Sequence, residues 1–204
     1  MTPSIDFYFD FASTYSYPTA LRIGPLAEAA GVSVRWKPFL LGPIFKAQGL
    51  ETSPFNLYPI KGRYMVRDVE RLCAQLGLSF KRPEPFPAHS LLAGRVGTVG
   101  VMEGWIERFA PAVYKAEFAE GKRIDDPAVI GEVLTSLGLD AEKTLARAQS
   151  DEIKGALRTA TDEAQRAGVF GAPSFVTADG ELFWGNDRLE QALAWARSHT
   201  EAAA

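Results

Sequence analysis

Two serines near the N-terminus have the spacing of a redox motif. Ser13 and Ser16 stand where a C-x-x-C sequence would place its two thiols, in the turn that leads from a predicted strand into a predicted helix. Backbone N–H groups at a helix start carry partial positive charge and stabilise a thiolate placed there. The Ser13 hydroxyl can donate a hydrogen bond to a bound thiolate but cannot form a disulfide. The alternative interpretation is that Ser13 only caps the helix, as serine often does.

The chain has few residues for redox or metal chemistry. It contains one cysteine, Cys73, and two histidines, His89 and His199. An internal disulfide is therefore impossible, a Cys/His zinc site lacks ligands, and no metal is expected. Dithiol chemistry is excluded because it needs a second thiol. Cys73 lies on an apolar helical stripe, which favours core packing over catalysis.

Composition narrows the class of partner. The chain has 204 residues, of which 47% are hydrophobic, with 22 Lys+Arg against 25 Asp+Glu and a net charge of −3. A basic surface for nucleic acid or anionic membrane is therefore not expected. No apolar run is long enough to span a bilayer, and the first ten residues lack the basic flank of a signal peptide. We therefore expect a cytoplasmic protein.

Local patterns predict strands at both ends of the chain and helices between them. Residues 5–11 and 32–41 read as strands around a helix at 16–30, which Pro25 is expected to kink or break. Connection rules favour a right-handed parallel unit. Near the C-terminus, residues 174–177 and 181–184 flank an Asp-Gly hairpin turn, and a last helix follows.

The middle of the chain is predicted to be almost all helix. Residues 42–59 read as a loop rich in proline and glycine, and a helix follows over residues 61–76. Residues 89–120 are mostly helical, with a break expected at Pro111. Further helices are expected to begin near Asp126, Asp140 and Ser150.

This order of elements predicts an α/β fold with a thioredoxin-like core (βαβ…ββα) interrupted by a large all-helical insertion. The core is expected to comprise residues 1–42 and 168–204, and the insertion residues 43–167. Pro173 falls just before the third strand. A cis peptide bond is plausible there, because X–Pro bonds alone tolerate cis at low cost.

Three motifs carry a resemblance to a known family. They are residues 7–13 (FYFDFAS), 168–175 (GVFGAPSF) and 183–189 (FWGNDRL). Together they resemble the 2-hydroxychromene-2-carboxylate isomerase family, which is related to kappa-class glutathione transferases within the DsbA-like branch of the thioredoxin superfamily. The resemblance covers essentially the whole chain.

The resemblance implies a glutathione site. Ser13 matches the catalytic serine that hydrogen-bonds the glutathione sulfur. The backbone of Ala172, before the expected cis-Pro173, would pair with the cysteinyl unit like an added strand. Asn186 and Asp187 match the positions that hold the γ-glutamyl end, although simple helix capping is the alternative.

The remaining site candidates lie beside the catalytic serine and in the substrate loop. Thr14 and Tyr15 complete the expected cofactor contacts, and Thr14 stands where the family usually has proline. Lys46, Asn56 and Lys61 are the candidates for holding an anionic aromatic substrate.

Other polar residues have plainer alternatives. Arg63, Arg67 and Arg71 share one helical face, which is usually solvated, although Arg67 is placed to reach a substrate carboxylate. His89 is a possible proton donor or simply a cap beside a proline-rich loop.

The implied activity is a glutathione-dependent isomerase in aromatic compound catabolism. The thiolate would add to a conjugated 2-oxo acid derivative, a bond would rotate, and elimination would regenerate glutathione. The resemblance also implies a homodimer. The alternatives are a kappa-like transferase or peroxidase that consumes glutathione, and a non-catalytic glutathione-binding module.

Overall fold

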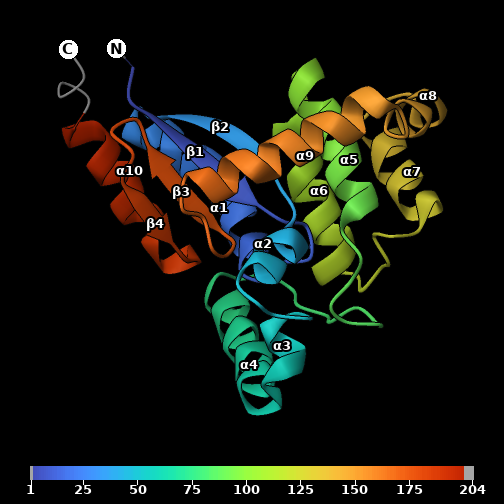
Figure 1. The fold of residues 1–204 in the computed structure, drawn as a ribbon, viewed down its shortest axis with the longest axis horizontal. Coiled ribbons are helices and arrows are strands. Elements are labelled where there is room, and N and C mark those ends of the chain that lie inside the picture. The colour runs from blue at the N-terminus through green and yellow to red at the C-terminus, as the bar shows by residue number, and fades with distance from the viewer. Residues whose placement is uncertain (1, 200–204) are drawn as a thin grey trace.

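The computed structural model describes residues 2–199 and contains a four-stranded mixed sheet, drawn on the left in Figure 1. Strand β1 (Ser4–Phe9) pairs in parallel with β2 (Ser33–Pro38) and antiparallel with β3 (Ser174–Thr177). Strand β3 in turn pairs antiparallel with β4 (Leu182–Trp184). The order β2-β1-β3-β4 places the N-terminal strand beside a strand from the other end of the chain, and the predicted thioredoxin-like fold is confirmed.

Helix α1 (Ser16–Ala30) follows β1 and continues through Pro25. Of the two alternatives expected, a kink or a break, the break is therefore wrong. Pro25 lies on the exposed face of the helix, where water can replace the hydrogen bond that its ring removes. The helix ends instead at Gly31, whose left-handed φ of 66° suits glycine.

The segment predicted as a loop contains two short helices, α2 (Leu41–Ala47) and α3 (Pro54–Leu57). Ser53 caps α3 by accepting a hydrogen bond from the Phe55 N–H at 3.3 Å, and proline occupies the first helical position. Ile44 is buried and anchors α2 against the body of the protein. Tertiary packing therefore stabilises helices in residues 42–59, although the composition of this segment favours turns.

Six more helices form most of the middle of the chain: α4 (Pro59–Gln75), α5 (Leu91–Glu103), α6 (Ile106–Phe118), α7 (Pro127–Ser136), α8 (Ala141–Arg147) and α9 (Asp151–Arg166). After β4, a 3-10 turn η1 (Asn186–Arg188) leads into the last described helix, α10 (Leu189–Ser198). The break expected at Pro111 lies instead at Gly104, which separates α5 from α6 with a φ of 78°. Pro111 is only the sixth residue of α6, so the missing N–H costs one early hydrogen bond and leaves the helix intact.

The two faces of β1 bury different side chains. Ile5, Phe7 and Phe9 belong to the larger core cluster, which also contains residues of α1 and α10, while Tyr8 packs with Phe39 in a smaller cluster on the other face. Burial of each Phe or Ile side chain in these clusters stabilises the fold by on the order of 1.5–3 kcal/mol. The larger cluster continues from the sheet into α5, α6 and α7, so the division into a core and a 43–167 insertion stays a prediction about chain organisation.

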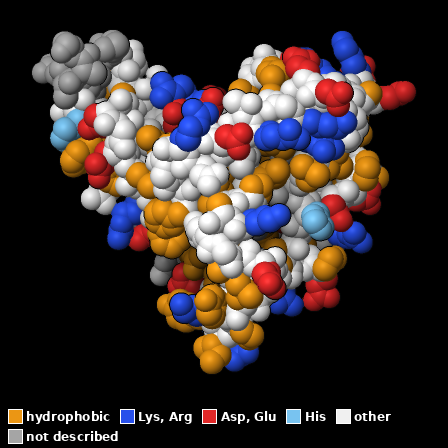
Figure 2. All heavy atoms as spheres, in the orientation of Figure 1, with side chains coloured by type: hydrophobic (Ala, Val, Ile, Leu, Met, Phe, Trp, Pro, Cys, Tyr) orange, Lys and Arg blue, Asp and Glu red, His pale blue; other side chains and the backbone are white. Residues whose placement is uncertain are grey.

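The surface mixes both signs of charge. Figure 2 shows Lys and Arg interspersed with Asp and Glu over this face, with apolar side chains gathered on the lobe formed by α3 and α4. That lobe carries the exposed side chains of Leu57, Tyr58, Ile60 and Tyr64. Over residues 2–199, no helix is both long and apolar enough to cross a membrane.

Candidate functional site

The Ser13 turn connects the end of β1 to the start of α1. The Ser13 N–H donates to the Asp10 carbonyl at 2.9 Å, and the Ser16 N–H donates to the Ser13 carbonyl at 3.1 Å. The Ser13 hydroxyl donates to the Ala172 carbonyl at 2.9 Å and makes no capping bond, because the N-cap of α1 is Tyr15. The interpretation of Ser13 as a simple helix cap is therefore wrong.

The Ala172–Pro173 peptide bond is cis, as predicted. It lies directly before β3, and the Gly185 N–H donates to the Pro173 carbonyl at 2.9 Å, which ties this bend to the end of β4. Two further cis bonds, Glu84–Pro85 and Phe86–Pro87, lie in the loop before α5 and were not predicted. Ser13 and Ala172 are thus in contact although 159 residues separate them.

Two cavities flank the Ser13 turn. A smaller cavity of about 650 Å³ is lined by Tyr15 and Ala172, together with residues of α4 and of the segment after β4. A larger cavity of about 950 Å³ is lined by Asp10 and Ala12, together with residues of α2 and of the loop before α5. Ser13 itself is 8% exposed and lines neither cavity. It lies in the chain between Ala12 of the larger cavity and Tyr15 of the smaller one, and its hydroxyl contacts Ala172 of the smaller cavity.

Asn186 and Asp187 line the smaller cavity in different ways. The Asn186 side chain is buried, and its Oδ1 accepts hydrogen bonds from the Thr19 hydroxyl at 3.0 Å and from Arg22 at 3.2 Å. The Asp187 carboxylate is exposed and pairs with Arg188 at 2.9 Å. Helix α10 begins after Arg188 and has no side-chain cap, so neither residue caps it.

Sequence reasoning missed two residues of the smaller cavity and misjudged a third residue on the same helix. Asp68 and Arg71 of α4 line it, and the Tyr15 hydroxyl donates to Asp68 at 2.8 Å. Arg67, the arginine expected to reach a carboxylate, pairs instead with Glu70 and lines neither cavity. Helical periodicity could show that the arginines share a face but not which of them meets the Ser13 turn.

Thr14 does not contact either cavity. Its side chain is buried, and it lies outside the linings of both. The structure therefore gives Thr14 a place in the scaffold of the turn, while Tyr15 is exposed to the smaller cavity.

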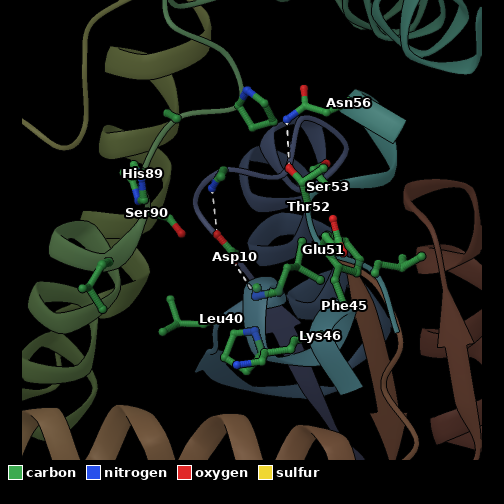
Figure 3. A pocket seen from close by; sticks show the side chains of 18 of the residues that line it. Asp10, Leu40, Phe45, Lys46, Glu51, Thr52, Ser53, Asn56, His89 and Ser90 are labelled. Carbon is green, nitrogen blue, oxygen red and sulfur yellow. Dashed lines mark hydrogen bonds between the residues drawn. The ribbon is translucent and has the colours of Figure 1, made fainter. Parts of the chain in front are cut away.

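Asp10 forms part of the wall of the larger cavity (Figure 3). Its Oδ1 accepts the Ala12 N–H at 2.9 Å, and its Oδ2 accepts the Leu41 N–H at 2.7 Å. One buried carboxyl group therefore joins the Ser13 turn to the start of α2. Burial raises the pKa of Asp10 above its usual value, and the two N–H groups and the Ser90 hydroxyl oppose that rise.

The larger cavity contains two of the three predicted substrate residues. Lys46 on α2 and Asn56 on α3 both line it, and the Asn56 amide donates to the Thr52 hydroxyl at 3.1 Å (Figure 3). His89 lines the opposite side. Lys61 lies outside it, because its ammonium group sits over the Tyr58 ring, 5.1 Å from the ring centre. Among residues 2–199, no group of three or more His, Cys, Asp or Glu side chains is arranged to hold a metal ion.

Comparison with known proteins agrees with this arrangement. Residues 4–194 match the family described as a DSBA-like thioredoxin domain. A 2-hydroxychromene-2-carboxylate isomerase from Sphingobium xenophagum is 30% identical, covering 93% of this chain and 96% of that protein. Glutathione S-transferase kappa 2 of Caenorhabditis elegans is 28% identical, covering 92% and 88%.

The solved structure of a 2-hydroxychromene-2-carboxylate isomerase matches with a TM-score of 0.85 and 25% identity over 98% of this chain and 100% of that one. The family resemblance found in the sequence motifs is therefore confirmed. The chain belongs to the DSBA-like thioredoxin domain family, in the branch that contains the 2-hydroxychromene-2-carboxylate isomerases.

Proposed function

We propose that this protein is a glutathione-dependent isomerase of 2-hydroxychromene-2-carboxylate and related aromatic 2-oxo acid derivatives. The position of the Ser13 turn carries the proposal, because Ala12 on one side of Ser13 lines the larger cavity, Tyr15 on the other side lines the smaller one, and the Ser13 hydroxyl contacts Ala172 of the smaller cavity. A thiol ligand in the smaller cavity and an acceptor in the larger one would therefore meet beside this turn. Relatives named as isomerases and as kappa-class glutathione transferases support this class of enzyme. Homodimerisation stays a prediction from the family.

The donor set of the smaller cavity fits glutathione. The tripeptide has two carboxylates and one ammonium group, and the cavity supplies both charges. Its polar side chains include Asp68, Arg71, Gln75, Asn186, Asp187 and Arg188. Arginine suits carboxylates because its planar N–H groups match them, and an exposed aspartate suits an ammonium group.

Ser13, the Ala172 carbonyl and the start of α1 have distinct roles in this proposal. Ser13 holds its hydroxyl hydrogen toward the Ala172 carbonyl; when that hydrogen turns to a bound thiolate, the carbonyl can accept a backbone N–H from the ligand. When bound, glutathione would supply a thiolate nucleophile that adds reversibly to a conjugated carbon. The positive end of α1 and the Ser13 hydroxyl would keep the sulfur ionised.

The larger cavity is proposed to hold the acceptor. Leu40, Phe45 and Leu91 provide apolar surface for an aromatic ring. Lys46 provides a mobile positive charge for the carboxylate, and within residues 2–199 it has no ion-pair partner.

Replacing Lys46 with methionine is expected to raise the KM for 2-hydroxychromene-2-carboxylate about fivefold, since an exposed ion pair contributes up to about 1 kcal/mol. The affinity for glutathione should stay unchanged. Lys61→Met is the matched control, because Lys61 lies outside both cavities. Steady-state kinetics with each substrate varied in turn would measure both effects. Equal KM values for the Lys46 and Lys61 variants would place the carboxylate elsewhere in the larger cavity.

The kappa-class relatives favour one alternative, a transferase or peroxidase that consumes glutathione. One assay separates these functions: ultraviolet-monitored conversion of 2-hydroxychromene-2-carboxylate with and without glutathione, with the free thiol titrated at the end. An isomerase converts substrate only with glutathione and leaves the thiol concentration constant. Loss of thiol in proportion to product would establish the transferase, and binding without conversion of either kind would indicate a non-catalytic module.

A further inference from the structure

A chain of polar contacts runs from the Ser13 turn to α4. The Tyr15 hydroxyl donates to one carboxylate oxygen of Asp68 at 2.8 Å, and the Arg71 guanidinium donates to the other at 3.1 Å. Arg71 also lies over the ring of Tyr64, 5.5 Å from the ring centre. Tyr15, Asp68 and Arg71 all line the smaller cavity, so these contacts fix where the guanidinium stands in that wall.

Asp68 orients Arg71, because one of its carboxylate oxygens accepts from Tyr15 and the other accepts from Arg71. Arg71 has capacity to spare. A guanidinium has five N–H donors, and the bond to Asp68 uses only the Nη2 group. Burial and the neighbouring Asp68 raise the pKa of Tyr15, so its hydroxyl remains a donor at ordinary pH.

The two walls of the smaller cavity carry different charge patterns. On one wall, Asp187 and Arg188 stand together with their charged groups 2.9 Å apart. That pair complements the γ-glutamyl end of glutathione, where an ammonium group and a carboxylate share one carbon. The glycyl end has a carboxylate alone and needs only a cation. Arg71 on α4 provides that cation in the same cavity.

We propose that Arg71 recognises the glycyl carboxylate of glutathione, and that Tyr15 is a positioning residue that acts on Arg71 through Asp68. This inference rests on the proposed function, because it assumes that the smaller cavity binds glutathione. It separates Tyr15 from the direct cofactor contacts expected from the sequence, and it gives α4 a share in specificity.

Calorimetric titration with two ligands tests the role of Arg71. Glutathione has a free glycyl carboxylate, whereas in its glycyl monoethyl ester that charge is masked. We expect Arg71→Gln to weaken glutathione binding about tenfold, as loss of one charge-assisted pair predicts, and to leave ester binding within about twofold of wild type. Arg67→Gln is the matched control on the same helix, because Arg67 pairs with Glu70 outside the cavity.

Tyr15→Phe tests the positioning role. It removes the hydroxyl that fixes Asp68 but keeps the ring, and we expect about threefold weaker glutathione binding with no effect on the ester. Added to Arg71→Gln, it should cause no further loss. A purely structural role of Tyr15 would weaken both ligands, in the single and in the double variant. Thermal melts of every variant show whether the comparison is made on folded protein.

The remaining outcomes are equally decisive. If wild type binds glutathione and Arg71→Gln behaves like Arg67→Gln, the inference about Arg71 is wrong while the proposed function stands. If Arg71→Gln weakens both ligands equally, the glycyl assignment is wrong and Arg71 serves another part of the tripeptide. If wild type binds neither ligand, the proposed function itself fails.

Discussion

Replacing Ser13 with alanine is expected to lower glutathione-dependent turnover by about 10- to 100-fold. The hydroxyl donates to the carbonyl of Ala172, which lines the smaller cavity, and a hydrogen bond to a charged group contributes about 1.5–3 kcal/mol. The variant should also raise the pKa of the bound thiol, because the thiolate loses its donor. A pH titration that follows the ultraviolet absorbance of the thiolate measures the pKa of the bound thiol independently of turnover.

Ser16→Ala is the matched control for Ser13→Ala. Ser16 is fully buried one helical turn later, and its hydroxyl oxygen has no hydrogen-bond partner among the described residues, whereas the Ser13 hydroxyl contacts Ala172 of the smaller cavity. Its loss should leave turnover within about twofold of wild type, since nothing at the reaction centre changes. Equal rates for wild type and Ser13→Ala would remove Ser13 from the reaction, and equal losses for the two serine variants would point to a general disturbance of the turn.

Replacing Glu117 with glutamine is expected to stabilise the fold at neutral and alkaline pH. Glu117 on α6 is fully buried, and within residues 2–199 neither carboxyl oxygen has a hydrogen-bond partner. Burial, and then the charge of Asp10, raise the pKa of Glu117 well above its usual value of 4.5. The native state therefore keeps a proton that the unfolded chain releases. Stability is lost as pH rises from the unfolded pKa toward the native pKa.

The effect should be large and should depend on pH. Between the unfolded and the native pKa of Glu117, each pH unit lowers the free energy of unfolding of wild type by about 1.4 kcal/mol. This corresponds to a fall of about 3–5 °C in Tm for a chain of this size. Thermal melts from pH 5 to pH 8 should show wild type falling relative to Glu117→Gln, with the two nearly equal at pH 5. Glu107→Gln is the control, because Glu107 is exposed on the same helix. Parallel curves for wild type and Glu117→Gln would show that Glu117 is ionised in the native state.

Local sequence patterns were sufficient to predict the strands and the helix that follows the Ser13 turn. The apolar residues at β1 are buried as a strand between two clusters, and the Asp-Gly turn between β3 and β4 is present with a φ of 85° at Gly180. The same patterns were insufficient for residues 42–59. Helix α2 depends on Ile44 packing with Tyr8, Phe39 and Ala164, and such a contact between distant segments leaves no mark on local composition.

The candidate site was partly predictable for a related reason. Ser13 and Pro173 lie in motifs whose backbone geometry demands particular residues, so the sequence itself marks them. Arg71 and Asp68 lie on a helix with several other charged residues, and only the docking of α4 against Tyr15 distinguishes them. Lys61 shows the converse, because its position in the sequence suggested the substrate cavity while its side chain packs over Tyr58.

The pairing of β1 with β3 has a consequence for the order in which the molecule forms. On the ribosome, residues 4–38 can make their parallel strand pair early, but the central strand lacks its second neighbour until residue 177 has been synthesised. Closing so long a loop is entropically costly, and contacts of high sequence separation slow folding. The Ser13–Ala172 contact, with its separation of 159 residues, therefore forms late in assembly, and the nascent chain can complete the Ser13 turn only after Ala172 has been synthesised.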